Sequence, residues 1–127
     1  MTTARLVRYP SQYPGAPHSG AVRAGDFLFL AGQTPKDEKM QPLHGEIEVL
    51  TRNVLDTISA TLKGLGSDLS QVVRATVWLS DLKLMSRYNA VFAEYFKDAL
   101  PVRSTVEAKL NHNVDIEIEV TVFSPQG

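Results

Sequence analysis

The residues that could do acid–base or ion-pair chemistry are gathered in the last quarter of the chain. One arginine, Arg103, and one glutamate, Glu107, alternate with other residues after Pro101, and Glu117 and Glu119 alternate with apolar residues further on. A strand face that carries one arginine and several carboxylates is often a plain solvated sheet face. The same set of charges could also form a site, and the elements that position it decide between these readings.

Two runs with a period of two predict strands on either side of a short polar turn. In the first run Arg103, Thr105 and Glu107 share a face, and in the second run Glu117, Glu119 and Thr121 do so. The turn at 111–113 is rich in asparagine, which favours a hairpin. A hairpin centred on His112 would set Arg103 opposite Thr121, Thr105 opposite Glu119, and Glu107 opposite Glu117. Two carboxylates in that position need a cation, a water molecule or a shared proton.

Composition narrows the class of protein. The 127 residues are 43% hydrophobic and 21% charged, with a formal net charge of −1, which is typical of one globular domain. Lysine and arginine are scattered, so nucleic acid is not an expected partner. No cysteine is present, which excludes disulfides, thiol nucleophiles and thiolate metal sites. Neither a signal sequence nor a membrane-spanning run is visible, and we expect a cytoplasmic protein without membrane contact.

Hydrophobic periodicity predicts the order of the remaining elements. Residues 1–16 read as an N-terminal loop or edge segment, with a possible short strand at 5–9, and 21–26 read as a strand end and a tight turn. The apolar run 27–32 is typical of a strand buried on both faces. Gly32 either simply ends that strand or lets a ligand approach the backbone closely.

Two helices and a strand complete the domain. Apolar residues recur at helical spacing over 46–62 and again over 81–99, and an alternating strand at 72–79 lies between them. The aromatic stripe of the second helix reads as core. The chain is therefore expected to fold as one α+β domain, a mixed sheet with two helices on one face. Arg74, Thr76 and Trp78 would lie on the uncovered face, which is a candidate interface between subunits.

Four segments together resemble the RidA/YjgF family, in the same order along the chain. They are 21–33 (AVRAGDFLFLAGQ), 77–82 (VWLSDL), 88–92 (YNAVF) with 95–96 (YF), and 101–107 (PVRSTVE) followed by 116–119 (IEIE). Each motif alone is moderately specific, whereas four in sequence are strong. The resemblance covers nearly all of the chain from about residue 17.

The resemblance implies a chorismate-mutase-like fold assembled as a homotrimer with clefts between the subunits. It also implies hydrolytic deamination of enamine and imine acids such as 2-aminoacrylate, giving a 2-keto acid and ammonia. No metal or organic cofactor is implied, and the expected partner is a small carboxylate substrate. A non-catalytic trimer that binds small carboxylates is the alternative.

The family's site residues can be transferred position by position. Arg103 matches the arginine that binds the substrate carboxylate, a role that suits its planar fork of donors. Glu117 matches the glutamate that holds the attacking water, and Glu119 is its possible substitute. The other matching positions at the expected cleft are Ala31, Gly32, Gln33, Asn89 and Thr105.

The chain departs from the archetype of the family at several of these positions. His18 stands where the archetype has a tyrosine, so it could line the pocket or be a loop residue without a role. Ala31 replaces a serine, which removes a hydroxyl group, and Thr105 replaces a cysteine. The interval from Arg103 to Leu110 is one residue shorter, which could change the strand positions that face the cleft. His44 and His112 read as exposed turn residues.

Overall fold

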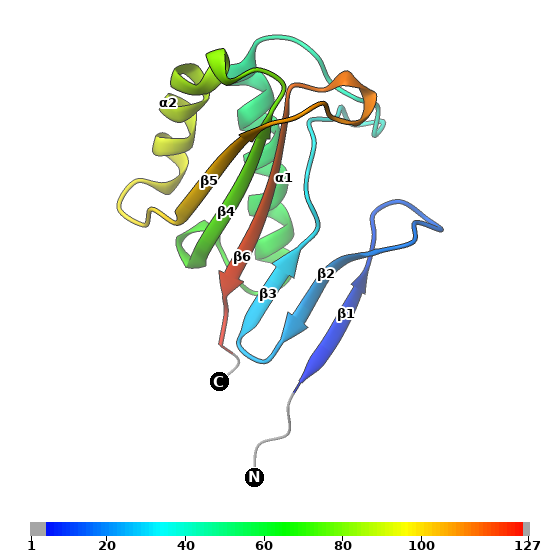
Figure 1. Ribbon diagram of the computed structural model, residues 1–127. Helices are drawn as coiled ribbons and strands as arrows, with labels where there is room; N and C mark the ends of the chain where they lie inside the picture. Colours follow the sequence, from blue (N-terminus) through cyan, green and yellow to red (C-terminus); the bar gives the residue numbers. More distant parts are fainter. Residues whose placement is uncertain (1–4, 126–127) are drawn as a thin grey trace.

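The computed structural model describes residues 5–125 and consists of a mixed six-stranded sheet with two helices on one face (Figure 1). The strands are Leu6–Pro10 (β1), Ser19–Ala24 (β2), Phe27–Leu30 (β3), Val72–Leu79 (β4), Val102–Glu107 (β5) and Ile116–Phe123 (β6). Their order across the sheet is β1-β2-β3-β6-β4-β5. Only β4 and β5 pair in parallel, and the other neighbours are antiparallel. The predicted α+β architecture is confirmed.

The two helices match the apolar stripes of the sequence. Helix Ile47–Gly64 (α1) buries Leu50, Val54, Ile58 and Leu62 completely. The second helix is shorter than the predicted 81–99: a 3₁₀ turn at Leu82–Leu84 (η2) precedes helix Met85–Phe96 (α2). The Asp81 side chain accepts a hydrogen bond from the backbone N–H of Lys83, and Lys97 ends α2 with a φ of 45°. A residue with positive φ at that point departs from helical geometry and ends the helical hydrogen-bond pattern.

The core lies between these helices and the central strands. Along β4, Ala75, Val77 and Leu79 are fully buried, and the apolar residues of β6 face the same side. Alternation along each strand sends the other residues to the opposite side of the sheet. The core is thus one layer between the sheet and the helices.

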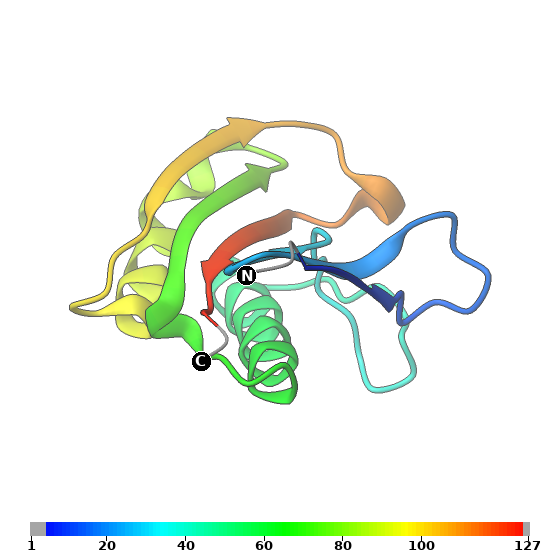
Figure 2. The same ribbon diagram turned by 90° about the horizontal axis from the view of Figure 1, so that it is seen from below.

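Within residues 5–125, the opposite face of the sheet carries no helix (Figure 2). The strand register places Arg74, Thr76 and Trp78 on this open face, as predicted. Large apolar side chains are exposed there, including Phe29 at 47% and Val102 at 58%. A run of exposed apolar side chains on a sheet face is typical of a surface that another protein covers.

The predicted hairpin between β5 and β6 is wrong, because β4 lies between these strands. Leu79 of β4 has Glu107 on one side and Ile116 on the other. The connection crosses the end of β4: the N–H of Ala108 donates to the carbonyl of Leu79, and the N–H of Ser80 donates to that of Asp115. Arg103 therefore does not face Thr121, nor Thr105 Glu119, nor Glu107 Glu117.

The apolar run 27–32 also differs from its prediction. Strand β3 buries Leu28 and Leu30 but exposes Phe27 and Phe29, so it is buried on one face only. The possible short strand at 5–9 is present as the edge strand β1, and β2 begins at Ser19, before the predicted segment 21–26. Gly25, with a φ of 61°, makes the tight turn between β2 and β3.

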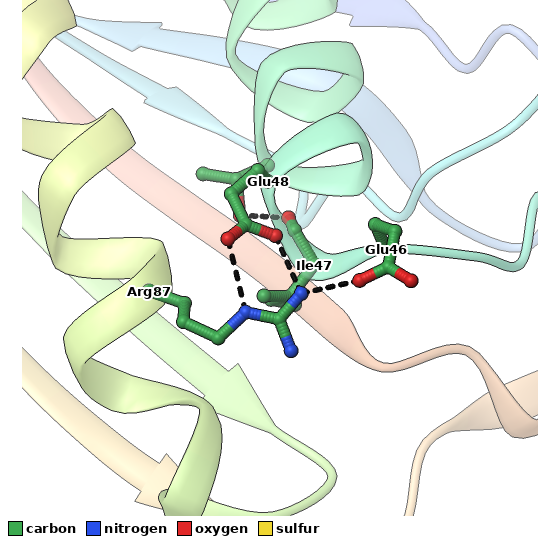
Figure 3. A network of polar contacts seen from close by, with 5 residues as sticks. Glu46, Ile47, Glu48 and Arg87 are labelled. Carbon is green, nitrogen blue, oxygen red and sulfur yellow. Dashed lines mark hydrogen bonds and ion pairs between the residues drawn. The ribbon is translucent and has the colours of Figure 1, made fainter.

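An exposed ion-pair cluster joins the beginning of α1 to α2 (Figure 3). The guanidinium of Arg87 donates to Glu48 at 2.9 and 2.7 Å and also contacts the carboxylate of Glu46. The hydrogen bonds from Arg87 are the main cause that lowers the pKa of Glu48. Such exposed pairs contribute little to stability, so the cluster mainly fixes the contact between the helices. Within residues 5–125, neither helix has the length and apolar character needed to span a membrane.

Candidate functional site

Arg103 lies on the helix-covered side of the sheet, on the edge strand β5. It pairs with the fully buried Ala75, so its side chain lies beneath α2. The guanidinium carbon is 4.9 Å from the ring centroids of both Tyr88 and Phe92. Within residues 5–125, no carboxylate lies within 4.0 Å of it. The rings hold the guanidinium by cation–π attraction while its N–H donors remain available to an anion.

The aromatic support of Arg103 is itself held in place. Tyr88 is fully buried, and its hydroxyl forms a 2.9 Å hydrogen bond with the hydroxyl of Thr105. Burial raises the pKa of Tyr88, so the ring stays neutral beside the cation. On the same helix, the side-chain oxygen of Asn89 is buried and has no hydrogen-bond partner among the described residues. Arg103 and Thr105 thus form one group of predicted site residues on the helix-covered side, where α2 also carries Asn89.

Glu117 lies on the open face and belongs to a second group. It pairs with Trp78 across β4, and its carboxylate packs against the backbone of Gly32. A Cβ atom at Gly32 would overlap Oε2 of Glu117 and lie 3.1 Å from its Cδ. One of the two alternatives for Gly32 was that a ligand approaches its backbone closely. In the structure this close approach is made by the Glu117 side chain of the same protein. Only glycine leaves room for it.

Burial raises the pKa of the Glu117 carboxyl, and the negative charge of neighbouring Glu119 raises it further. The positive charge of Lys36 acts in the opposite direction. Glu119 is exposed and two residues further along β6. A partly desolvated carboxylate is the better candidate for a base, since its proton affinity is closer to that needed at neutral pH.

The segment after β3 is fixed beside Glu117 by Gln33. The backbone N–H and C=O of Gln33 both bond to Ile118 of β6, at 2.8 and 3.0 Å. The Gln33 side chain donates to the carbonyl of Ala31 and accepts from Gln12 at 3.2 Å. It also accepts from Lys36 at 3.4 Å. Gln33 is therefore fixed in position beside Glu117, and it links the N-terminal loop to β6.

Two adjoining hollows open beside Glu117. One has a volume of about 550 Å³ and extends between the N-terminal loop and the end of α1, while the other, of about 520 Å³, lies on the open face. The predicted residues that line both are His18, Ala31, Gly32 and Glu117. Gln33 lines the first hollow and Glu119 the second.

His18 lines both hollows with one ring nitrogen already engaged. Its Nδ1 lies 3.0 Å from the carbonyl oxygen of Ser19. Since a carbonyl only accepts, Nδ1 carries the hydrogen in this contact and Nε2 is the nitrogen left for a ligand. His44 and His112 are exposed, as predicted, although His112 also lines the first hollow.

The predicted site residues thus separate into two groups on opposite sides of the sheet. The predicted hairpin placed Arg103 on the same surface as Glu117, and this placement is wrong within one chain. Three contributors were not predicted as site residues. Tyr88 and Phe92 belong to the aromatic stripe that was assigned to the core, and Lys36 was not singled out. The aromatic spacing in α2 gave a signal for the first two, whereas nothing in the sequence distinguished Lys36.

Residues 10–124 match the family described as Endoribonuclease L-PSP. The chain belongs to this family, the RidA/YjgF family. A RutC family protein of Pyrococcus horikoshii is 42% identical over 112 residues, which are 87% of this chain and 89% of that protein.

Solved structures of the RidA/YjgF family share the fold. A putative endoribonuclease of Thermotoga maritima superposes with a TM-score of 0.84 at 34% identity, covering 99% of each chain. A Rid family protein of unknown function from Yersinia pestis also has a TM-score of 0.84, at 30% identity, covering 95% of this chain and 99% of that one. The two groups of site residues are therefore set on a RidA/YjgF fold.

Proposed function

We propose that this protein is a hydrolytic deaminase of small enamine and imine acids. The observation that carries the proposal is the Arg103 guanidinium, which rests on Tyr88 and Phe92 without a carboxylate partner among residues 5–125. A cation held by uncharged aromatic rings keeps its full charge for a ligand. The planar fork would bind a substrate carboxylate through two charge-assisted hydrogen bonds.

Glu117 would act as the base. Its carboxylate takes a proton from water while the water oxygen forms a bond to the imine carbon, and the protonated Glu117 then passes this proton to the nitrogen, which gives the carbinolamine. In the second half Glu117 takes the hydroxyl proton and returns it to the amino nitrogen, so that the C–N bond breaks, ammonia leaves and a C=O bond forms. The sum is imine acid plus water giving 2-keto acid plus ammonia, with no change of oxidation state. An enamine enters this sequence after it tautomerises to the imine.

The anchor and the base would come from different subunits. Arg103 and Glu117 lie on opposite sides of the sheet of one chain, so they can meet only across an interface. The exposed apolar residues of the open face support such an interface. A head-to-tail contact that closes after three subunits would make three equivalent clefts, each with Arg103 of one subunit near Glu117 of the next.

A carboxylate-binding trimer without chemistry is the second candidate. Ala31 in the wall of the hollow brings no hydroxyl group, and His18 offers a ring nitrogen in place of a phenol. These two positions leave the anchor intact but alter the groups around the reacting nitrogen. This candidate predicts binding of 2-keto acids through Arg103 without turnover.

The test couples a pyridoxal-phosphate threonine or serine dehydratase to this protein and follows the appearance of 2-keto acid. Wild type is compared with Arg103→Ala, and the oligomeric state of both is measured by light scattering. Faster keto-acid release with wild type alone supports the deaminase. Thermal stabilisation by 2-keto acids without acceleration favours the binder. Because relatives carry the name endoribonuclease, an RNA-cleavage assay at two salt concentrations is run in parallel, and cleavage lost in Arg103→Ala would contradict both candidates.

A further inference from the structure

Lys36 is a buried lysine close to the candidate base. Its side chain and backbone together are only 8% exposed, although it lies in the connection between β3 and α1. Asn53 of α1 fixes its backbone in both directions: Lys36 N–H donates to Asn53 Oδ1 at 3.0 Å, and Asn53 Nδ2 donates to the Lys36 carbonyl at 2.8 Å. The position of this lysine is therefore set by the fold.

The ammonium group of Lys36 is held by uncharged acceptors. It donates to the carbonyl of Thr34 at 2.8 Å and to Oε1 of Gln33 at 3.4 Å. Within residues 5–125, no carboxylate lies within 4.0 Å of it. A buried ammonium without a paired carboxylate is costly, and burial is the main cause that lowers the pKa of Lys36.

Glu117 is the group that this charge affects. The negative charge of Glu117 acts against the effect of burial on the pKa of Lys36, and Lys36 acts in turn to lower the pKa of Glu117. Gln33 connects the two positions, since its side chain binds Lys36 while its backbone is paired with Ile118, the neighbour of Glu117. Lys36 and Glu117 are too far apart for a direct hydrogen bond. Their charges interact through a partly buried region, where charges are poorly screened.

The other titratable groups around Glu117 do not replace Lys36. Glu119 on the same strand has the same charge and opposes ionisation. His18 and His112 line the first hollow from two different loops, and both are exposed. Among residues 5–125, Lys36 is the buried cation that acts on the pKa of Glu117.

We propose that Lys36 is a positioning residue whose buried ammonium keeps the Glu117 carboxylate ionised and therefore able to act as a base. The catalytic consequence rests on the proposed deaminase function, whereas the electrostatic effect on Glu117 does not. Lys36 need not touch the substrate, because it acts through the charge state of Glu117.

The test replaces the charge while keeping the volume. Lys36→Met removes the ammonium, Lys36→Arg retains a positive charge, and Lys39→Met removes an exposed lysine from the same connection as a matched control. A buried charge can often be replaced by an apolar side chain of similar volume without unfolding the protein. Folding and assembly of each variant are checked by thermal melting and light scattering.

The first readout is independent of activity. The Glu117 carboxyl carbon is titrated by NMR, with its resonance assigned from Glu117→Gln. In Lys36→Met the titration should move to higher pH, and in Lys36→Arg and Lys39→Met it should stay near that of wild type. An unchanged titration in folded Lys36→Met overturns the proposal, whether or not the protein is a deaminase.

The second readout is the pH profile of kcat/KM. In Lys36→Met the acid limb should move to higher pH, with kcat/KM about three- to tenfold lower on that limb and little changed on the plateau. Lys36→Arg should restore the profile. A loss that is equal at every pH, with an unchanged Glu117 titration, would mean direct contact with substrate and would also overturn the positioning role.

Discussion

Arg103 and Glu117 lie on opposite faces of the same sheet, on strands that both border β4. Arg103 shares the helix-covered face with Ala75, while Glu117 shares the open face with Trp78. Two groups separated by a packed sheet cannot contact one small substrate. If both act in one reaction, each cleft takes one of them from a neighbouring subunit.

Mixed oligomers test this division directly. Arg103→Ala and Glu117→Gln should each be inactive alone. When their subunits are unfolded together and refolded, random assembly should restore about a quarter of the wild-type activity, because one interface in four joins an intact Arg103 to an intact Glu117. Mixing Arg103→Ala with the double variant should restore nothing. Activity that stays absent in well-assembled mixtures of the single variants would contradict a shared site.

Truncation of the anchor should remove turnover without loss of the fold. Arg103→Ala loses two charge-assisted hydrogen bonds to the substrate, so kcat/KM should fall about 100-fold or more. Arg103→Lys should recover only part of the loss, since an ammonium cannot make the paired contact. Arg52→Ala, which removes an exposed arginine paired with Glu94, is the control and should remain near wild type. Equal losses in the Arg103 and Arg52 variants would argue against a specific anchor.

Gly32→Ala should displace the candidate base. The added Cβ would overlap the Glu117 carboxylate, and a misplaced catalytic group commonly lowers kcat about 100-fold. Melting temperature and kcat are measured for Gly32→Ala and for the Gly32→Ala, Glu117→Ala double variant. Removing the carboxylate relieves the overlap, so the double variant should regain stability but not activity.

Gly64→Ala is the matched control for that substitution. A Cβ at Gly64, the last residue of α1, meets nothing within 4 Å. Its stability should be unchanged or increased by up to about 0.5 kcal/mol, because alanine restricts the unfolded chain. A Gly32→Ala variant that melts like Gly64→Ala and turns over like wild type would refute the close packing.

Charge on the open face should prevent assembly. Phe29 is 47% exposed on that face, so Phe29→Glu would place a carboxylate in the proposed interface. Sedimentation should show a folded monomer without deaminase activity. Val49→Glu alters a side chain that is 57% exposed on α1, and this variant should still assemble. Assembly by the Phe29 variant would exclude this face as the interface.

The raised pKa of Glu117 predicts how stability depends on pH. Because the folded state raises this pKa above its ordinary value of 4.5, the folded protein binds the proton more tightly than the unfolded chain does. This carboxylate therefore costs stability as the pH rises above 4.5. Glu117→Gln should melt at a higher temperature than wild type at neutral pH, and the difference should shrink toward pH 4.

Glu38→Gln, at an exposed position in the loop, controls for the loss of one negative charge. Melting curves of all three proteins between pH 4 and 8 are compared. A Glu117→Gln variant that is less stable than wild type at pH 7 would contradict the predicted sign.

The periodicity of apolar residues was sufficient to predict the helices and strands, but it did not predict which strands are neighbours in the sheet. The alternation around Arg103 and around Glu117 gave the correct sets of residues on each strand face. A run with a period of two has the same pattern whether its partner is the next strand in sequence or a third one, so the insertion of β4 left no local signal. The face of Arg103 relative to Glu117 was wrong for that reason.

The residues around the pocket also divide into those that the sequence identified and those whose role depends on contacts between distant residues. Ala31, Gly32, Gln33 and His18 were identified by resemblance, and the structure brings them together beside Glu117. Lys36 could not be identified, because its burial depends on Asn53 of α1, a contact between distant residues. Tyr88 was correctly assigned to the interior, yet its support of Arg103 depends on the parallel pairing of β4 with β5.

The strand order also has a consequence for synthesis on the ribosome. The last strand, β6, fills the middle of the sheet between β3 and β4. Until residues 116–123 have left the exit tunnel, the β1–β3 unit and the β4–β5 pair each keep an open inner edge, and strand edges of this kind promote association between chains. The nascent protein can complete its sheet only after β6 has been translated, so ribosome stalling between β5 and β6 would leave an aggregation-prone intermediate.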